Sequence, residues 1–322
     1  MDHQGKALRF GAWVILLAVV LRLASTGFFQ PLASLFQNPN IQSFLIYIET
    51  GRKVRFSPSS EDFDRESPVP QERVEPLPSM SGAEVDVYYA CSLRPDIPSL
   101  LAQPLKWDLR GTEPTVLILH THATESYTKH GEPYTESAAF RTLDEQYNML
   151  SIGGAVAEIL SSHGIGVIHD RELHDYPSYD GSYNHARESI RYYLEKYPSI
   201  QLVLDLHRDA SGDLNNQRRS VVKVDGQDCA QLMLVMGSDG AGLSHPNWEE
   251  NLALGLKLQA VLEHQVPGIT RPLTLRGQRF NQDLSPGAVL VEVGTAGNSH
   301  AEALLAAKML AEAVAVLAHG TE

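Results

Sequence analysis

Two stretches of the sequence carry histidine and carboxylate side chains at a spacing that suits a metal ion. His122-x-x-Glu125 follows an apolar run typical of a buried strand, and His207 ends a second such run far along the chain. A turn after the first strand can aim His122 and Glu125 at one ion. Two histidines, a glutamate and a water form a recurrent open site in zinc hydrolases. The pattern therefore predicts Zn²⁺ bound by His122, Glu125 and His207.

A fourth candidate, Glu292, lies inside a further apolar run. A buried carboxylate without a partner is costly, so its presence there suggests a function. Zinc lowers the pKa of water and polarises a carbonyl. A carboxylate next to the ion can accept the proton of that water and pass it to a leaving amine. We expect Glu292 to be this catalytic base.

Several neighbours of these residues leave alternatives open. His120 is two residues from His122 and is its rival as a ligand. We favour His122 because it completes the H-x-x-E pattern, which leaves His120 to support a ligand or contact substrate. Asp205 and Asp209 flank His207, and either can orient the ring by accepting its second N–H.

Three further polar residues are candidates for substrate contacts. Arg208 follows His207 and suits a substrate carboxylate, although an ion pair with a neighbouring aspartate is the alternative. Arg276 and Asn281 lie in a Gly/Pro-rich loop before the Glu292 run. They either grip the sugar or peptide of a substrate or pack the loop.

The elements that position these residues alternate between strand and helix. Five apolar runs predict strands, at Val116–His120, Ile165–His169, Gln201–His207, Gln231–Met236 and Ala288–Val293. Helical spacing predicts helices at Tyr147–His163, Arg187–Tyr197, Asn247 to about His264, and from Ser299 onward. Continuous apolar strands alternating with helices favour an α/β fold, a mostly parallel twisted sheet with helices on both faces. In such sheets, sites form at the carboxyl ends of the strands.

The N-terminal part has a different composition. Residues 10–36 are mostly apolar, with Arg22 as the only charged residue, and they follow Lys6 and Arg9. This pattern predicts an uncleaved transmembrane helix with the rest of the chain extracytoplasmic. Residues 57–81 are rich in Pro, Ser, Glu and Asp and predict a linker.

We therefore divide the chain into a cytoplasmic start and membrane anchor (1–36), a juxtamembrane segment and linker (37–113), and a catalytic domain (114–322). Residues 82–113 are open to two interpretations, a small strand cap on the domain or more spacer.

Overall charge and cysteine content exclude some classes of function. With 26 basic and 39 acidic residues the formal charge is −13, which argues against nucleic-acid binding because phosphate recognition needs concentrated Lys and Arg. The two cysteines, Cys91 and Cys229, share no short motif and either pair as a disulfide or remain thiols.

Several of these segments together resemble the stage II sporulation protein P family. The resemblance extends from about Pro114 to the C-terminus and rests on five motifs: VLILHTHATESY (116–127), DLHRD (205–209), AQLMLVMG (230–237), NWEENL (247–252) and NQDLSPGAVLVEVG (281–294).

The resemblance implies a fold similar to zinc-dependent N-acetylmuramoyl-L-alanine amidases. It implies cleavage of the amide between muramic acid and the stem peptide of peptidoglycan, and endopeptidase activity on stem-peptide cross-links. It also implies a role in septal wall degradation and engulfment during sporulation. The implied partners are a lytic transglycosylase of the stage II sporulation protein D family and a membrane protein of the stage II sporulation protein M family.

Carried over to this sequence, the family motif puts metal ligands in the HTHATE segment and at His207, and the catalytic carboxylate at Glu292. Related amidases take their glutamate ligand from the start of the helix after the first strand. This chain has Gln146 there, which is not a carboxylate. We therefore assign that ligand to Glu125, with Glu136 as its rival.

Two other functions are compatible with the same residues. A carboxypeptidase-like zinc peptidase acting on wall peptides would need an arginine clamp for a terminal carboxylate, from Arg208 or Arg276. A non-catalytic wall-binding scaffold would need none of the four site residues, all of which are present.

Overall fold

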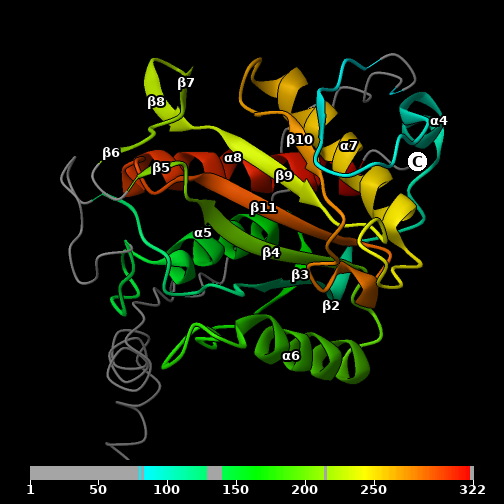
Figure 1. Ribbon diagram of the computed structural model, residues 1–322, viewed down its shortest axis with the longest axis horizontal. Helices are drawn as coiled ribbons and strands as arrows, with labels where there is room; N and C mark the ends of the chain where they lie inside the picture. The colour runs from blue at the N-terminus through cyan, green and yellow to red at the C-terminus, as the bar shows by residue number, and fades with distance from the viewer. Residues whose placement is uncertain (1–79, 81–82, 129–139, 214–215, 320–322) are drawn as a thin grey trace, which may run out of the picture. The chain divides into compact units, whose positions relative to one another are not determined.

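The computed structural model describes residue 80 and residues 83–128, 140–213 and 216–319 (Figure 1). The chain divides into two compact units, 1–72 and 73–322, and every described residue belongs to the second. The predicted membrane anchor and most of the predicted linker lie outside the described residues. Within the described residues, no helix has both the length and the apolar character needed to cross a membrane.

The centre of the domain is a seven-stranded sheet with the order β1-β10-β9-β11-β4-β2-β3. Five of the six neighbouring pairs are parallel, and only β9 and β11 are antiparallel. The strands are β1 (Val87–Tyr89), β2 (Gly111–Leu119), β3 (Ile165–His169), β4 (Leu202–Asp209), β9 (Leu232–Met236), β10 (Leu273–Leu275) and β11 (Ala288–Thr295). Two small hairpins stand apart, β5 (Gly212–Asp213) with β6 (Asn216–Gln217), and β7 (Val221–Val224) with β8 (Gln227–Ala230).

Helices cover both faces of this sheet, as the sequence predicts. They are α4 (Ile97–Ala102), α5 (Met149–Ser162), α6 (Ser182–Lys196), α7 (Trp248–Gln265) and α8 (His300–His319), with a short 3-10 turn, η1 (Gln282–Leu284). The main core lies between the sheet and α5, α7 and α8. A smaller core, which includes Leu119, Ala186 and Val203, packs α6 against the opposite face (Figure 1).

Local sequence signals explain how several helices begin and end. Asn148 caps α5 by accepting a hydrogen bond from the Leu150 amide at 3.0 Å. Gly164 follows α5 with φ +75°, the left-handed conformation that ends helices and favours glycine. Ser299 and Glu302 form the reciprocal bonds of a capping box at α8. At the start of α7, by contrast, the Asn247 side chain makes no capping hydrogen bond.

The predicted start of the catalytic domain at residue 114 is too late. Val87–Tyr89 forms the edge strand β1, paired in parallel with β10, and α4 packs against α7. The buried Lys257 of α7 fixes α4 by donating to the carbonyls of Leu100 at 3.1 Å and Leu101 at 2.5 Å. Residues 83–113 are therefore part of the domain, the first of the two interpretations left open. This segment carries no long apolar run, so periodicity alone does not reveal it.

Both cysteines are free thiols. Cys91 is half-buried and Cys229 is buried in the main core. Burial raises the pKa of the Cys229 thiol to about 11, so it is protonated near neutral pH.

Candidate active site

The candidate residues gather where β2, β4 and β11 end at one edge of the sheet. In the parallel β4/β11 pair, Glu292 lies directly opposite His207. In the β2/β4 pair, Leu119 lies opposite Asp205, so the turn that carries His122 and Glu125 begins beside the same strand. Side chains alternate between the faces of a strand. Asp205 and His207 therefore share the α6 face, while Leu206 between them enters the main core.

His122 is nearly buried and lies edge-on to His207, with 5.2 Å between the ring centroids. Its Nε2 atom forms a 3.2 Å hydrogen bond with the hydroxyl of Tyr179, whose ring stacks on the imidazole at 4.6 Å. Its Nδ1 atom is buried and has no hydrogen-bond partner. Burial is the main reason that the pKa of His122 falls to about 4, so the ring is neutral at pH 7.

Glu125 faces His207, and positively charged groups hold it in place. One carboxylate oxygen accepts the backbone N–H of Arg208 at 3.1 Å and lies 3.7 Å from Nδ1 of His207. The other lies 3.4 Å from the guanidinium of Arg141 and 3.6 Å from that of Arg208. Burial by itself raises the pKa of this carboxyl, but the charges of Arg208 and His207 outweigh burial and lower it. Glu125 is therefore a carboxylate at neutral pH.

Asp205 orients His207 from the other side. Its Oδ1 atom is 2.9 Å from Nε2 of His207, and the carboxylate also accepts bonds from the backbone N–H and the hydroxyl of Thr121. Burial opposes charge on both partners, but their attraction dominates. The pKa of His207 rises to about 9 and that of Asp205 falls to about 2. Asp209, the other predicted orienting residue, pairs instead with Arg271 at 2.6 Å.

Glu292 differs from the other two carboxylates because its Oε2 atom is buried without a partner. Burial raises its pKa to about 7, with the charge of Glu125 adding to the rise and that of His207 opposing it. A carboxyl with a pKa near neutrality can both accept and return a proton, which is what a general acid/base needs.

The fit to zinc rests on the donor chemistry and on unsatisfied buried atoms. Two ligands of a tetrahedral zinc ion stand about 3.4 Å apart when each is about 2.1 Å from the metal. The 3.7 Å between Glu125 and Nδ1 of His207 is close to that value. The unpartnered Nδ1 of His122 adds a third donor of the right kind. Among the described residues, no three His, Cys, Asp or Glu side chains already form a set that could hold an ion. The donor types suit zinc, and binding would require side-chain movements that bring the three donors together.

His120 is not a ligand candidate in this structure. The side chain is fully buried, with Nδ1 3.0 Å from the carbonyl of Leu206 and Nε2 2.9 Å from His169. Both ring nitrogens are engaged, so His120 neither faces the ion nor touches a substrate. It supports the strand that carries His207.

The predicted substrate contacts of Arg208 and Arg276 are not found. Arg208 is buried, and its guanidinium donates to the carbonyls of Ser126 at 3.1 Å and Phe140 at 2.9 Å. It therefore holds the turn, and its guanidinium lies 3.6 Å from Glu125. Arg276 follows β10, which runs antiparallel to β4 and β11, so it lies at the opposite edge of the sheet.

Asn281 packs the loop against α6, the second of its two predicted roles. Its amide donates to the carbonyl of Tyr183 at 2.8 Å, and its oxygen accepts from Arg187, which also pairs with Asp283. Gln146, the residue in place of the amidase glutamate, is exposed. Glu136, the rival of Glu125, lies outside the described residues.

Several residues of the β3–α6 loop also support the site, and no sequence pattern predicted them. Asp175 accepts bonds from the backbone N–H and hydroxyl of Thr124 and from Arg141. Tyr179 covers His122, and Tyr183 lies edge-on to it at 5.5 Å. None of these residues falls in an apolar run or a ligand-type spacing, and only the concentration of tyrosines in this loop marks it.

Comparison with known proteins identifies the family. The family model described as Stage II sporulation protein P matches residues 38–315, most of the chain. The chain belongs to the stage II sporulation protein P family. It is 26% identical to stage II sporulation protein P of Bacillus subtilis (strain 168) over 213 residues, which are 63% of this chain and 50% of that protein. The match thus spans about half the length of the curated relative.

Solved structures similar to this family member include two amidases. One is an N-acetylmuramoyl-L-alanine amidase of Nostoc punctiforme, with 16% identity, a TM-score of 0.39, and coverage of 65% of this chain and 97% of that one. The other is the CwlD amidase from Clostridioides difficile in complex with the GerS lipoprotein, with 13% identity, a TM-score of 0.40, and coverage of 64% and 98%.

Proposed function

We propose that this stage II sporulation protein P family member is a zinc-dependent peptidoglycan hydrolase. It cleaves the N-acetylmuramoyl-L-alanine amide and also cuts cross-links between stem peptides, in septal wall degradation and engulfment during sporulation. The observation that carries the proposal is the position of Glu292, a buried carboxyl with an unpartnered oxygen, directly opposite His207 at the end of neighbouring parallel strands.

Each residue of the site has a distinct part in this reaction. His122, Glu125 and His207 would hold the zinc ion. When bound, zinc would polarise the carbonyl of the substrate and lower the pKa of a water. Glu292 takes the proton of the attacking water and returns it to the amine that leaves, a transfer favoured by its pKa of about 7. Asp205 fixes the orientation of His207, and Arg208 and Arg141 keep Glu125 ionised.

The remaining parts of the proposal concern location and partners. We propose that residues 10–36 anchor the chain in the membrane with the catalytic domain extracytoplasmic. Its partners there are peptidoglycan and, in the engulfment machinery, a lytic transglycosylase and a membrane protein. Apolar composition after Lys6 and Arg9 supports the anchor, and family membership supports the partners.

Digestion of purified sacculi tests the proposed reaction. The full-length protein, purified in detergent, is incubated with sacculi with and without a chelator, and the products are identified by mass spectrometry. We expect free stem peptides with an N-terminal alanine, split cross-linked dimers, and restoration of both by Zn²⁺ after chelation. Removal of single C-terminal residues would instead support a carboxypeptidase. Failure to digest any wall bond with zinc bound would support a scaffold.

Neither arginine that the sequence offers to the carboxypeptidase alternative supports it over the amidase. It needs a free arginine to hold a terminal carboxylate, and Arg208 is committed to backbone carbonyls. Arg276 is at the far edge of the sheet.

A further inference from the structure

Tyr179 has an unusual position for an exposed tyrosine. Its side chain is 55% exposed, yet its ring lies face to face with the nearly buried His122, with 16° between the ring planes. Among the described residues, its hydroxyl forms the only hydrogen bond found for the imidazole of His122, 3.2 Å from Nε2. The other ring nitrogen, Nδ1, is buried and unpartnered.

The loop that carries Tyr179 is held firmly in place. Asp175 bonds to Thr124 and Arg141, and His174 bonds to Asp170 at 3.1 Å. The guanidinium of Arg141 lies 4.7 Å from the centroid of the Tyr179 ring. The loop that carries Tyr179 is thus bonded to the turn that carries His122, and these bonds hold the two rings in contact.

A neutral imidazole carries its proton on one nitrogen and a lone pair on the other, and only the lone pair can bind a metal. The hydrogen bond at the second nitrogen decides which tautomer is present, and such partners orient metal-binding histidines. Because Tyr179 occupies the Nε2 side, only Nδ1 can face an ion.

We propose that Tyr179 is a positioning residue for His122. His122 donates its Nε2–H to the Tyr179 hydroxyl, which leaves the Nδ1 lone pair free for the ion. At His207, Asp205 lies 2.9 Å from Nε2, and Nδ1 faces Glu125. Both histidines then bind through Nδ1. This inference rests on the zinc site of the proposed function, but the tautomer itself does not depend on a metal.

The test compares Tyr179→Phe, which keeps the stacked ring and removes the hydroxyl, with Tyr176→Phe as the matched control. Tyr176 lies in the same loop and is equally exposed, at 54%. Full-length proteins with ¹⁵N-labelled histidine are examined by NMR at pH 7 without metal, and His122→Gln assigns the His122 signals. We expect the Nε2–H tautomer in the unaltered protein and in Tyr176→Phe, and a mixture of tautomers in Tyr179→Phe.

Metal binding supplies the second measurement. We expect Tyr179→Phe to bind Zn²⁺ about 10- to 100-fold more weakly than Tyr176→Phe in chelator competition. We also expect a changed visible spectrum for the Co²⁺-substituted protein. An Nδ1–H tautomer in the unaltered protein, or an unchanged tautomer and zinc affinity in Tyr179→Phe, would overturn the proposal. If the unaltered protein bound neither ion, the proposed function would fail, while the tautomer measurement would still decide the role of Tyr179.

Discussion

The sheet has two halves that differ in what they bury. The parallel half, β11, β4, β2 and β3, ends in a group of titratable side chains with unpartnered buried atoms on His122 and Glu292. The reversed half, β9, β10 and β1, packs against α7, where the charged Lys257 and the amide nitrogen of Gln259 donate to backbone carbonyls and tie elements together. The unpartnered oxygen of Gln259 is neutral.

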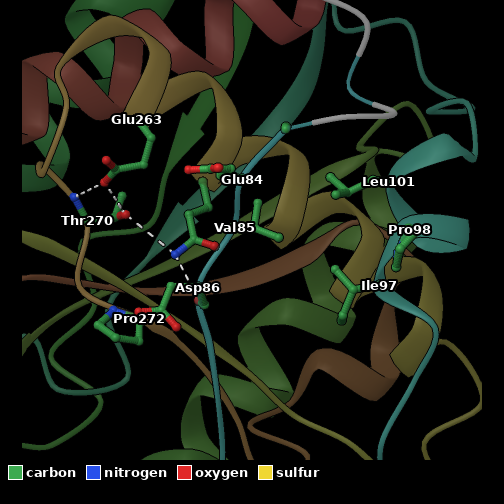
Figure 2. Close-up of a pocket in the computed structure, with 11 residues that line it drawn as sticks. Glu84, Val85, Asp86, Ile97, Pro98, Leu101, Glu263, Thr270 and Pro272 are labelled. Carbon is green, nitrogen blue, oxygen red and sulfur yellow. Dashed lines mark hydrogen bonds between the residues drawn. The ribbon is translucent and has the colours of Figure 1, made fainter.

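The reversed half nevertheless contains a substantial pocket of about 670 Å³. Figure 2 shows Ile97, Pro98 and Leu101 along one side, and Glu263 bonded to Thr270 across from them. None of the four candidate catalytic and metal-binding residues lines it. Buried ionisable groups without partners therefore indicate a catalytic site better than a surface pocket does. A pocket costs the fold little free energy, whereas an unpartnered buried carboxyl costs much more. Substitutions in each half test whether activity depends on the parallel half alone.

The largest effect on hydrolysis at unchanged zinc content should come from Glu292→Gln. Glutamine keeps the shape of the side chain and cannot transfer the proton, so we expect wall hydrolysis to fall by about 10²- to 10⁴-fold. Because the substitution removes a buried ionisable group without a partner, zinc content and the midpoint of thermal unfolding should be maintained. Activity on sacculi, metal analysis and calorimetry measure the three quantities. Retained hydrolysis would remove Glu292 from the mechanism.

His207→Ala should abolish zinc binding together with activity. The substitution removes a ligand and leaves Asp205 and Glu125 without the imidazole between them, so we expect a loss of about 3–5 kcal/mol in unfolding free energy. Metal analysis and chemical denaturation at neutral pH measure these effects, with Glu292→Gln as the variant that keeps zinc. Normal zinc content in His207→Ala would show that the ligand set is wrong.

Gly153→Ala should reach the site indirectly, through α5. A methyl group there would stand 2.4 Å from Nε2 of His120 and 2.6 Å from Nε2 of His169, so the histidine pair must shift. We expect destabilisation of about 1–3 kcal/mol and reduced activity, since His120 bonds to the residue before His207. Gly154→Ala is the matched control, because the neighbouring glycine has open space around it. Equal behaviour of the two variants would contradict the supporting role of His120.

In the reversed half, Lys257→Met should affect stability alone. Methionine fills a similar volume but leaves the carbonyls of Leu100 and Leu101 without their donor, at a cost of about 1–3 kcal/mol. Specific activity of the folded protein should not change. A loss of activity at unchanged stability would mean that the two halves are coupled.

The smallest effect should follow Glu84→Gln, at the pocket in the reversed half. Glu84 is exposed, and we expect neither wall hydrolysis nor the thermal midpoint to change. A clear loss of hydrolysis would give this pocket a part in the reaction and end the contrast.

Much of the parallel half could be predicted from the sequence. Continuous apolar runs located β2, β3, β4 and β11, and the rule that parallel strands end at one edge brought His207 and Glu292 together, as their register confirms. The reversed half was harder to predict. β1 and β10 have three residues each, too few for a hydrophobic period, and β9 gave no sign of its direction.

The position of Arg276 follows from that direction. Because the chain reverses at β9, the loop after β10 opens at the opposite edge from the loops after β4 and β11. An arginine that is near Glu292 along the sequence is therefore remote from it in space.

Local patterns in the chain predict the longer strands and helices and the residue types of the site, because hydrophobic periodicity and ligand spacing are local properties of the chain. The tertiary structure alone decided which atoms of those residues are free. Both ring nitrogens of His120 contact partners that lie 49 and 86 residues away along the chain. In His122, by contrast, Nδ1 has no partner and Nε2 bonds to Tyr179, which lies 57 residues away. Hydrogen bonding between distant segments depends on how the elements pack, and no local pattern in the chain encodes it.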